Sequence, residues 1–267
     1  VMEIKLCNVS YDNLLEDFYY KFEAGKATGI IGNSFSGKSL IGSIIMGEVT
    51  LSSGSIKVNG KSDYDFYKFI RNIGYVSQRP WEQFVTLKVY DEIAFGLLQF
   101  KFKLASIDKQ ISNALLMVGL DDSYLERRVD TLSKGEAVLV RIASCLALNP
   151  KALLIDDISN NLDFKARACI IELFRKIKDR YNKNIIILSS DVSFVLDFCD
   201  DYILLNDGCI VSQGSVSDLI NHSDSLLASG LKFRDEYYFY LLARKRYNVN
   251  IKGSTCDDII KDVIDNV

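Results

Sequence analysis

The first third of the chain alternates short apolar runs with turn residues, most often glycine. Such runs predict β-strands. Several of the connections are too short to hold the helix that joins two parallel strands, so we expect an antiparallel sheet packed beside a parallel one. The predicted strands cover residues 3–9, 17–22, 27–31, 55–58 and 73–76.

A different pattern fills the middle of the chain. Between residues 85 and 148 apolar residues recur at spacings of three and four, which predicts a helical subdomain. The chain then returns to apolar runs separated by helical stretches. Runs without alternation are typical of parallel strands that are buried on both faces. These strands are predicted at residues 152–155, 185–188, 202–205 and 210–211, with helices at 166–178 and 192–198.

The last part of the chain is helical and rich in aromatic residues. We therefore expect an α/β domain at residues 1–214, with a mixed sheet core, an antiparallel β subdomain and the helical subdomain at about 85–148. Residues 215–267 are expected to form a C-terminal helical extension. Its apolar stripe at 237–242 suits either a small satellite core or a contact between subunits.

Residues 32–39 read G-N-S-F-S-G-K-S and follow directly after the predicted strand 27–31. This is the phosphate-loop pattern G-x-x-x-x-G-K-[ST], and an apolar helical stretch follows it as the motif requires. A strand that breaks into glycines before a helix leaves several backbone N–H groups directed at one point, which suits phosphate oxygens. Lys38 is expected to reach the terminal phosphates, and the Ser39 hydroxyl to ligate Mg²⁺.

Two further motifs lie later in the chain. The predicted strand 152–155 runs into Asp156 and Asp157, which suits the first as a ligand on the Mg²⁺ side and the second as the group beside an attacking water. Ser133 precedes a helical stretch and Glu136 stands three positions later, which is the spacing of a capping box. Taken alone, this second motif predicts only the start of a helix.

Composition narrows the function classes. The net charge is −3 at pH 7 and the isoelectric point is near 5.4, so the chain carries no electrostatic signal for nucleic acid. The N-terminal sequence lacks the layout of a signal peptide, and no apolar run reaches the length that spans a bilayer. We expect a cytoplasmic protein whose membrane association comes through a partner.

The order of these motifs resembles the ATP-binding cassette (ABC) ATPases over nearly the whole chain. Gln78, in Y-V-S-Q, matches the glutamine loop of that family. The sequence L-S-K-G-E at 132–136 matches its signature, L-L-I-D-D at 153–157 its acidic strand, and S-N-N-L-D at 159–163 its D-loop. Tyr11 matches the aromatic residue that stacks on adenine.

A subfamily resemblance lies in two regions. The segment 78–97 carries a second glutamine, Gln83, and ends in E-I-A-F-G-L, which is similar to the energising subunits of energy-coupling factor (ECF) transporters. The tail at 226–246 and 257–263 is similar to the C-terminal extension through which two such subunits touch. This resemblance implies an importer of vitamins or metal ions such as cobalt.

The resemblance implies ATP and Mg²⁺ as ligands and a position on the cytoplasmic face of the cell membrane. It implies a sibling ATPase and a membrane scaffold as partners, an indirect link to a substrate-binding membrane subunit, and no nucleic acid. The implied catalytic residues are Asp157, Ser190 and Gln78, and the implied metal ligands are Ser39, Gln78 and Asp156. The implied nucleotide contacts are Tyr11, Gly32, Asn33, Ser34, Phe35, Ser36, Gly37, Lys38, Ser39, Leu40, Ser133, Lys134, Gly135 and Glu136.

The chain departs from the family where hydrolysis is catalysed. Asp157 stands where the family has Glu, and it is one methylene shorter, so its carboxylate reaches less far toward a water. Ser190 stands at the position of the switch histidine, and the only histidine, His222, lies in the tail. Lys134 replaces the first glycine of the signature, and Phe35 replaces a small residue in the phosphate loop. The sequence does not decide whether Lys134 faces phosphate or crowds it.

These departures predict firm ATP binding with weak hydrolysis at the chain's own phosphate loop. In ABC ATPases the signature of one subunit completes the site of the other, so the weak site favours a heterodimer with a sibling that keeps Glu and His. The leading hypothesis is an ATP-binding subunit of an ECF-type importer. The alternative is a non-catalytic module whose bound ATP clamps a membrane complex.

Overall fold

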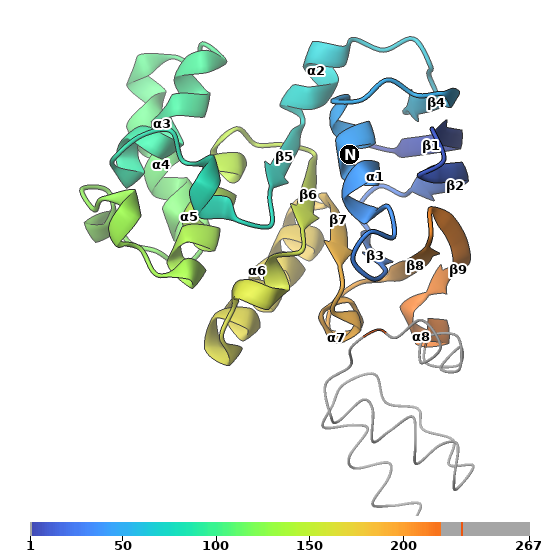
Figure 1. Cartoon of the computed structure of the whole chain (residues 1–267). Helices are drawn as coiled ribbons and strands as arrows, with labels where there is room; N and C mark the ends of the chain where they lie inside the picture. Colours follow the sequence, from blue (N-terminus) through green and yellow to red (C-terminus); the bar gives the residue numbers. More distant parts are fainter. Residues whose placement is uncertain (1, 220–230, 232–267) are drawn as a thin grey trace, which may run out of the picture.

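The computed structural model describes residues 2–219 and 231. Its centre is a six-stranded sheet with the order β5-β6-β7-β3-β8-β9 (Figure 1). Four strands follow one another in parallel: β5 (Ile73–Val76), β6 (Ala152–Asp156), β7 (Asn184–Ser189) and β3 (Ala27–Ile31). Strand β8 (Asp201–Asn206) is parallel to β3, and β9 (Cys209–Ser215) closes the edge as an antiparallel hairpin with β8.

Both faces of this sheet are buried, which is why its central strands are apolar without alternation. Odd and even residues of β7 belong to two different cores: Ile185 and Ile187 face one, and Ile186 and Leu188 the other. Helix α1 (Lys38–Met46) covers one face together with a second sheet. Helices α6 (Phe164–Tyr181) and α7 (Val192–Leu196) cover the opposite face.

The second sheet is three-stranded and antiparallel, with the order β2-β1-β4. It consists of β1 (Ile4–Tyr11), β2 (Leu15–Phe22) and β4 (Ser53–Val58). Ile4 pairs with Phe22 on one side and with Val58 on the other, so three buried side chains meet against the core. The two-sheet arrangement predicted from the short connections is therefore confirmed.

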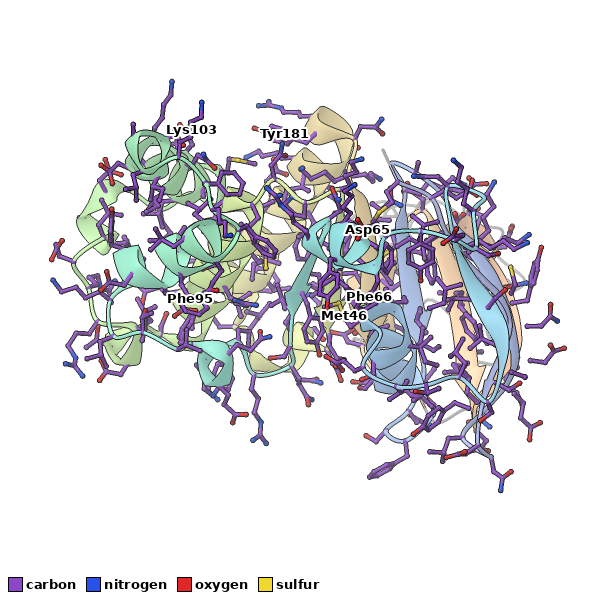
Figure 2. All side chains as sticks on the ribbon, turned by 90° about the horizontal axis from the view of Figure 1, so that it is seen from above. Met46, Asp65, Phe66, Phe95, Lys103 and Tyr181 are labelled. Carbon is purple, nitrogen blue, oxygen red and sulfur yellow. The ribbon has the colours of Figure 1, made fainter. Side chains whose placement is uncertain are left out.

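The helical subdomain lies on the β5 side of the central sheet, away from the antiparallel sheet (Figures 1 and 2). It contains α3 (Val89–Gln99), α4 (Leu104–Met117) and α5 (Lys134–Ala147), which pack on one another. Phe95 and Lys103 mark it in Figure 2, while Met46 and Phe66 lie beside the central sheet. The apolar spacing between residues 85 and 148 predicted this block correctly.

Two elements differ from the expectation. Helix α2 (Phe66–Arg71) was not predicted, because its six residues are too few for a helical period to show. It begins at Asp65, whose side chain accepts a hydrogen bond from Lys68 N. Strand β9 runs to Ser215, and α8 (Val216–Leu219) follows at once. The tail helices and the aromatic stripe predicted beyond that point lie outside the described residues, and the division at 214/215 stays a prediction.

Candidate nucleotide site

The phosphate loop follows β3 and leads into α1. Gly37 has φ +100°, a left-handed conformation that only glycine adopts without strain. A Cβ on Gly32 would lie 2.3 Å from Ser36 Oγ and 2.5 Å from the carbonyl oxygen of Leu205. The loop therefore needs both glycines to fold tightly against the end of β8. The first turn of α1 then presents its free N–H groups toward the loop, as anion binding requires.

Lys38 is buried under this loop, at 7% exposure. Its Nζ donates to the carbonyl oxygens of Gly32 and Asn33, both at 2.7 Å. Burial lowers the pKa of Lys38, and the nearby carboxylates of Asp157 and Asp156 oppose that shift. The ammonium thus sits inside the loop beside two acidic groups, where phosphate oxygens would complete its coordination.

A cavity of about 470 Å³ opens above the loop. That volume is within the usual range for a nucleotide-sized ligand. Nine of the predicted site residues line it, and they come from three separate parts of the sequence: Ser34, Phe35, Gly37, Lys38, Ser39, Leu40, Gln78, Asp156 and Asp157. The fold therefore brings the phosphate loop, the glutamine loop and the acidic strand to one cavity.

The fit of a divalent cation can be judged from Ser39 and Asp156. Ser39 Oγ lies 3.5 Å from Asp156 Oδ1, so a hydroxyl and a carboxylate share one wall of the cavity. Burial raises the pKa of Asp156, and the charge of Asp157 adds to the shift. Hard oxygen ligands and uncompensated negative charge are what Mg²⁺ binds, with substrate phosphates as its remaining ligands. The residues present fit the predicted ion.

Tyr75 closes the far side of this carboxylate. Its hydroxyl lies 3.5 Å from Asp156 Oδ2. Burial, together with the charge of Asp156, raises the pKa of Tyr75 to about 12, so the phenol stays protonated and serves only as a donor. In the described residues no three His, Cys, Asp or Glu side chains gather into a protein-only metal site.

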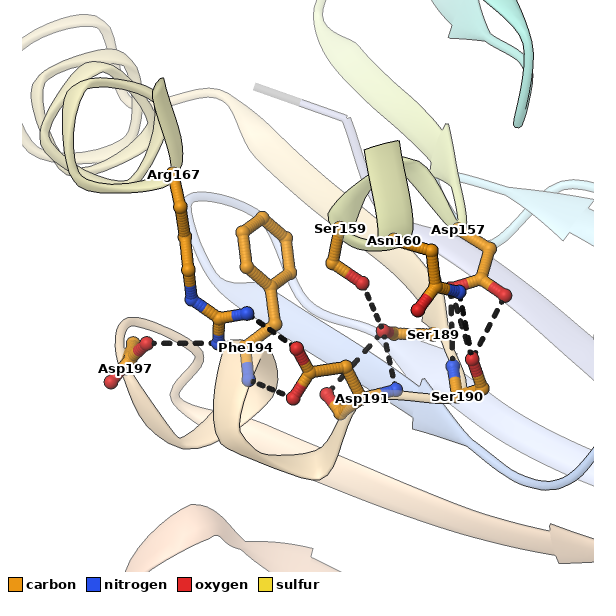
Figure 3. A network of polar contacts seen from close by, with 9 residues as sticks. All are labelled: Asp157, Ser159, Asn160, Arg167, Ser189, Ser190, Asp191, Phe194 and Asp197. Carbon is orange, nitrogen blue, oxygen red and sulfur yellow. Dashed lines mark hydrogen bonds and ion pairs between the residues drawn. The ribbon is translucent and has the colours of Figure 1, made fainter. Parts of the chain in front are cut away.

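Asp157 is held by hydrogen bonds from the loop after β7 and from its own turn (Figure 3). Ser190 Oγ donates to Asp157 Oδ2 at 3.0 Å, and Ser190 N lies 3.3 Å from Oδ1. Asn160 Nδ2 also donates to Oδ1 at 3.3 Å. The backbone of Asp157 is left-handed, with φ +42°. The structure thus places Ser190 beside Asp157, and the catalytic roles of both residues stay predictions.

The signature residues lie elsewhere. Ser133 and Glu136 form the predicted capping box at the start of α5: Ser133 Oγ accepts from Glu136 N at 3.2 Å, and Glu136 Oε2 accepts from Ser133 N at 2.7 Å. Lys134 lies with its Nζ 5.5 Å from the ring centre of Trp81. None of the predicted signature contacts, Ser133, Lys134, Gly135 and Glu136, lines the phosphate cavity of the same chain.

Glu136 makes the start of α5 sensitive to acid. Hydrogen bonds from Arg127, opposed by partial burial, lower its pKa to about 2 from a usual 4.5. A carboxylate with a lowered pKa stabilises the fold above pH 4.5 and loses that contribution as the pH falls toward 2. We expect Glu136→Gln to lose less stability than the parent chain between pH 5 and pH 3, measured by urea unfolding. The isosteric variant Asp91→Asn, on exposed α3 surface, is the control and should follow the parent; equal pH dependence in Glu136→Gln would contradict the assignment.

The aromatic residue predicted to stack on the base is not part of the cavity lining. Tyr11 does not line the cavity; it is partly buried against the core between the two sheets. Leu14, three residues further along the β1–β2 turn, lines the cavity with 60% of its surface exposed. Phe35 also lines the cavity, is fully exposed and has φ +66°, which is strained for a bulky side chain. The stacking role of Tyr11 stays a prediction.

Sequence reasoning did not single out three residues: Leu14, which lines the phosphate cavity, Asn160, which bonds Asp157, and Trp81, which lies beside Lys134 in a separate cavity. Leu14 has no chemistry that a motif could flag, and an asparagine in a turn is usually a turn former. Trp81 is the only tryptophan in the chain, and this was the one signal in the sequence that could have drawn attention to it. Their importance comes from where the fold places them.

A phosphate loop after β3, acidic residues after β6 and a polar switch position after β7 lie together at the carboxyl ends of parallel strands. With the antiparallel sheet and the helical subdomain, they define a P-loop nucleotide-binding protein of the cassette type. Comparison with known proteins agrees. The family model described as ABC transporter matches residues 15–160.

Relatives narrow this further. The energy-coupling factor transporter ATP-binding protein EcfA1 of Staphylococcus aureus (strain MRSA252) is 33% identical over 222 residues, which cover 81% of either protein. The protein of the same name from Leuconostoc mesenteroides is 30% identical over 252 residues, covering 90% of this chain and 92% of the relative. The chain therefore belongs to the ABC transporter family, on the branch of the ECF ATP-binding proteins.

Solved structures show the same architecture. CbiO1 from Clostridium perfringens, described as part of the ABC transporter complex cbiONQ, matches with a TM-score of 0.77 and 26% identity, over 84% of this chain and 93% of that one. The ATP-binding cassette MJ0796, in a dimeric post-hydrolysis state with ADP and Pi, matches with a TM-score of 0.71 and 25% identity, over 80% of this chain and 98% of that one.

Proposed function

We propose that this chain is an ATP-binding subunit of an ECF-type importer that pairs with a sibling ATPase and hydrolyses ATP weakly at its own phosphate loop. The observation that carries the division of labour is the short carboxylate of Asp157, bound by Ser190 Oγ at 3.0 Å. A general base must point a free oxygen at the attacking water. Here the carboxylate of Asp157 reaches less far than that of a glutamate, and one of its oxygens is occupied by the hydrogen bond from Ser190.

We infer the pairing of two ATPase chains from the residues that line the phosphate cavity. The lining of the cavity that holds Lys38 and Asp156 includes no signature residue, which supports a second chain as the source of that side of the site. By the same logic, Ser133 and Gly135 would serve nucleotide bound by the sibling. The MJ0796 cassette, which is described as dimeric with ADP and Pi, has the same fold and supports a paired arrangement.

Within the cavity we assign roles by chemistry. The loop 32–40 and Lys38 would hold the phosphates, while Ser39, Asp156 and Gln78 would hold Mg²⁺. The bound ion would neutralise phosphate charge during hydrolysis. Asp157 and Ser190 would occupy the catalytic positions with reduced strength. Leu14 lines the cavity and would contact the base, and Tyr11 lies three residues before it along the chain.

The membrane partner is assigned a groove on the helical subdomain. A second cavity of about 410 Å³ lies between Trp81 in the 3₁₀ helix η1 (Pro80–Gln83) and α5. Its walls are mainly apolar: Trp81, Phe84, Val129, Leu132 and Ala137, with Asp130 and Lys134 at the edge. This shape suits a short amphipathic helix of a membrane scaffold. None of the helices in residues 2–219 could itself cross a bilayer.

The experiment that tests this function is reconstitution. The chain is co-expressed with each ATPase and membrane protein encoded beside it, and uptake of labelled vitamins and of Co²⁺ or Ni²⁺ is measured in proteoliposomes. ATP-dependent uptake that needs this chain and one sibling supports the proposal. Transport by this chain without a sibling would contradict the heterodimer, and a stable complex that never hydrolyses ATP would favour the clamp.

Trp81 allows a sharper test of the groove. Trp81→Ala removes the largest apolar wall and also the ring that Lys134 contacts, so we expect at least a tenfold weaker association with the membrane scaffold, on the scale of one interface aromatic residue. ATP affinity should be unchanged. The matched control is Tyr67→Ala on α2, an aromatic residue that is 86% exposed and lies outside the groove. Equal losses in both variants would rule out the groove as the docking site.

A further inference from the structure

The turn after β6 and the loop after β7 are joined at Asn160 (Figure 3). Asn160 belongs to η4 (Ile158–Asn161), the 3₁₀ turn that leads into α6. Its amide nitrogen lies 3.2 Å from Ser190 Oγ and 3.3 Å from Asp157 Oδ1. An amide has two N–H donors, so one can serve each partner. The three side chains therefore form a closed triangle of hydrogen bonds.

The direction of these bonds fixes the Ser190 hydroxyl. It has one proton and accepts a bond from Asn160, so its proton is left to point at Asp157. The carboxylate then receives bonds from Ser190 Oγ, Ser190 N and Asn160 Nδ2. A carboxylate has about four lone-pair sites, so about one remains for water. The lone pairs that a base needs are mostly occupied.

A second link joins helix α6, which follows this turn, to the loop after β7 (Figure 3). Arg167, in the first turn of α6, donates to Asp191 and, at 3.2 Å, to Asp197 Oδ2. Its guanidinium also lies 5.0 Å from the ring centre of Phe194. Burial by itself lowers the pKa of Arg167, but the hydrogen bonds and charges of Asp191 and Asp197 together outweigh it, so the pKa is raised. The charged guanidinium of Arg167 therefore fixes the segment from Asp191 to Asp197, which directly follows Ser190.

We propose that Asn160 is a positioning residue that restrains hydrolysis: through Ser190 it keeps the Asp157 carboxylate occupied, so that the turn 158–161 sets the rate at this site. The inference rests on the proposed weak hydrolysis and names what regulates it. Arg167 makes the restraint effective because it prevents the Ser190 loop from moving away with its donors. The turn 158–161 thereby slows ATP hydrolysis in addition to the short side chain of Asp157.

The reaction shows why this arrangement slows it. In hydrolysis the oxygen of water bonds to the γ-phosphorus, the bond from that phosphorus to the bridging oxygen breaks, and ADP leaves with the electron pair. The water proton must pass to a base, here the Asp157 carboxylate. Releasing Asn160 frees a lone pair on Oδ1 and lets the Ser190 hydroxyl rotate, so the carboxylate can accept that proton.

The test uses the full chain in single-turnover assays with labelled ATP and protein in excess. We expect Asn160→Ala to raise the cleavage rate about 3- to 10-fold, which corresponds to about one hydrogen bond released from the carboxylate. The dissociation constant for ATP should stay within about twofold, because no phosphate contact changes. Asn72→Ala is the matched control: it also removes an amide side chain that donates one hydrogen bond, but to Lys68 O at the end of α2 and not to the Asp157 turn. Its rate should match the parent.

A second measurement is independent of cleavage. Amide hydrogen exchange, without nucleotide, should become faster at residues 158–161 and 189–191 in Asn160→Ala than in the parent, and should stay unchanged there in Asn72→Ala. Adding Asp157→Asn to Asn160→Ala should remove the gain in rate. An unchanged or slower rate in Asn160→Ala would overturn the positioning role and leave the proposed function standing. Rapid cleavage by the parent chain would overturn both.

Discussion

The variant carrying Asp157→Glu and Ser190→His together should cleave ATP about 10- to 100-fold faster than the parent chain. The longer carboxylate extends toward the water, and imidazole adds a donor for the charge that develops on the γ-phosphate. A positioned base and a positioned donor each supply factors of at least this size in enzymes. In the parent, the carboxylate oxygens of Asp157 accept hydrogen bonds from Ser190 instead.

The measurement is release of inorganic phosphate by the full chain, alone and with its sibling. Asp157→Glu by itself should give a smaller gain, because Asn160 and Ser190 still bind the carboxylate. The matched control is Asp218→Glu, which lengthens a side chain on α8 away from the phosphate cavity. If the double variant cleaves ATP at the rate of the parent, Asp157 and Ser190 are not the residues that limit hydrolysis at this site.

The second large effect concerns Lys38. Lys38→Ala should weaken ATP binding about 100-fold, since one buried ammonium provides charge-assisted bonds worth about 1.5–3 kcal/mol each. Its place is fixed inside the loop by bonds of 2.7 Å to the Gly32 and Asn33 carbonyls. Titration calorimetry with Mg–ATP measures the change. Lys109→Ala, an exposed lysine on α4, is the control and should bind as the parent does.

The same variant separates the two hypotheses for function. If ATP drives an ATPase motor through both sites, Lys38→Ala lowers transport while the complex still assembles. If the ATP at this site acts as a clamp, Lys38→Ala costs assembly, and transport per assembled complex is unchanged. Size-exclusion chromatography of the reconstituted complex, together with uptake per complex, distinguishes these results. ATP affinity within about twofold of the parent would contradict the phosphate-binding role of Lys38 itself.

The sequence determined much of the fold because the information it needed was local. Strands β3 and β5 were predicted to the residue, since each is a short apolar run between turn residues. The capping box at Ser133 and Glu136 depends on a spacing of three, and it formed as predicted. The phosphate loop is also local, because strand, glycines and helix are consecutive. Helix α2 was too short for its period to appear.

The tertiary structure alone decided how distant residues combine. Asn160 and Ser190 are thirty positions apart, and they meet because β6 and β7 are neighbouring parallel strands whose carboxyl ends coincide. Trp81 and Lys134 meet because η1 packs on α5. Hydrogen bonds and ring contacts act over a few ångströms, so between residues that are far apart in the sequence no spacing can report them. The phosphate loop at 32–39 can therefore be predicted from the sequence, whereas the hydrogen bonds that restrain Asp157 can be seen only in the folded protein.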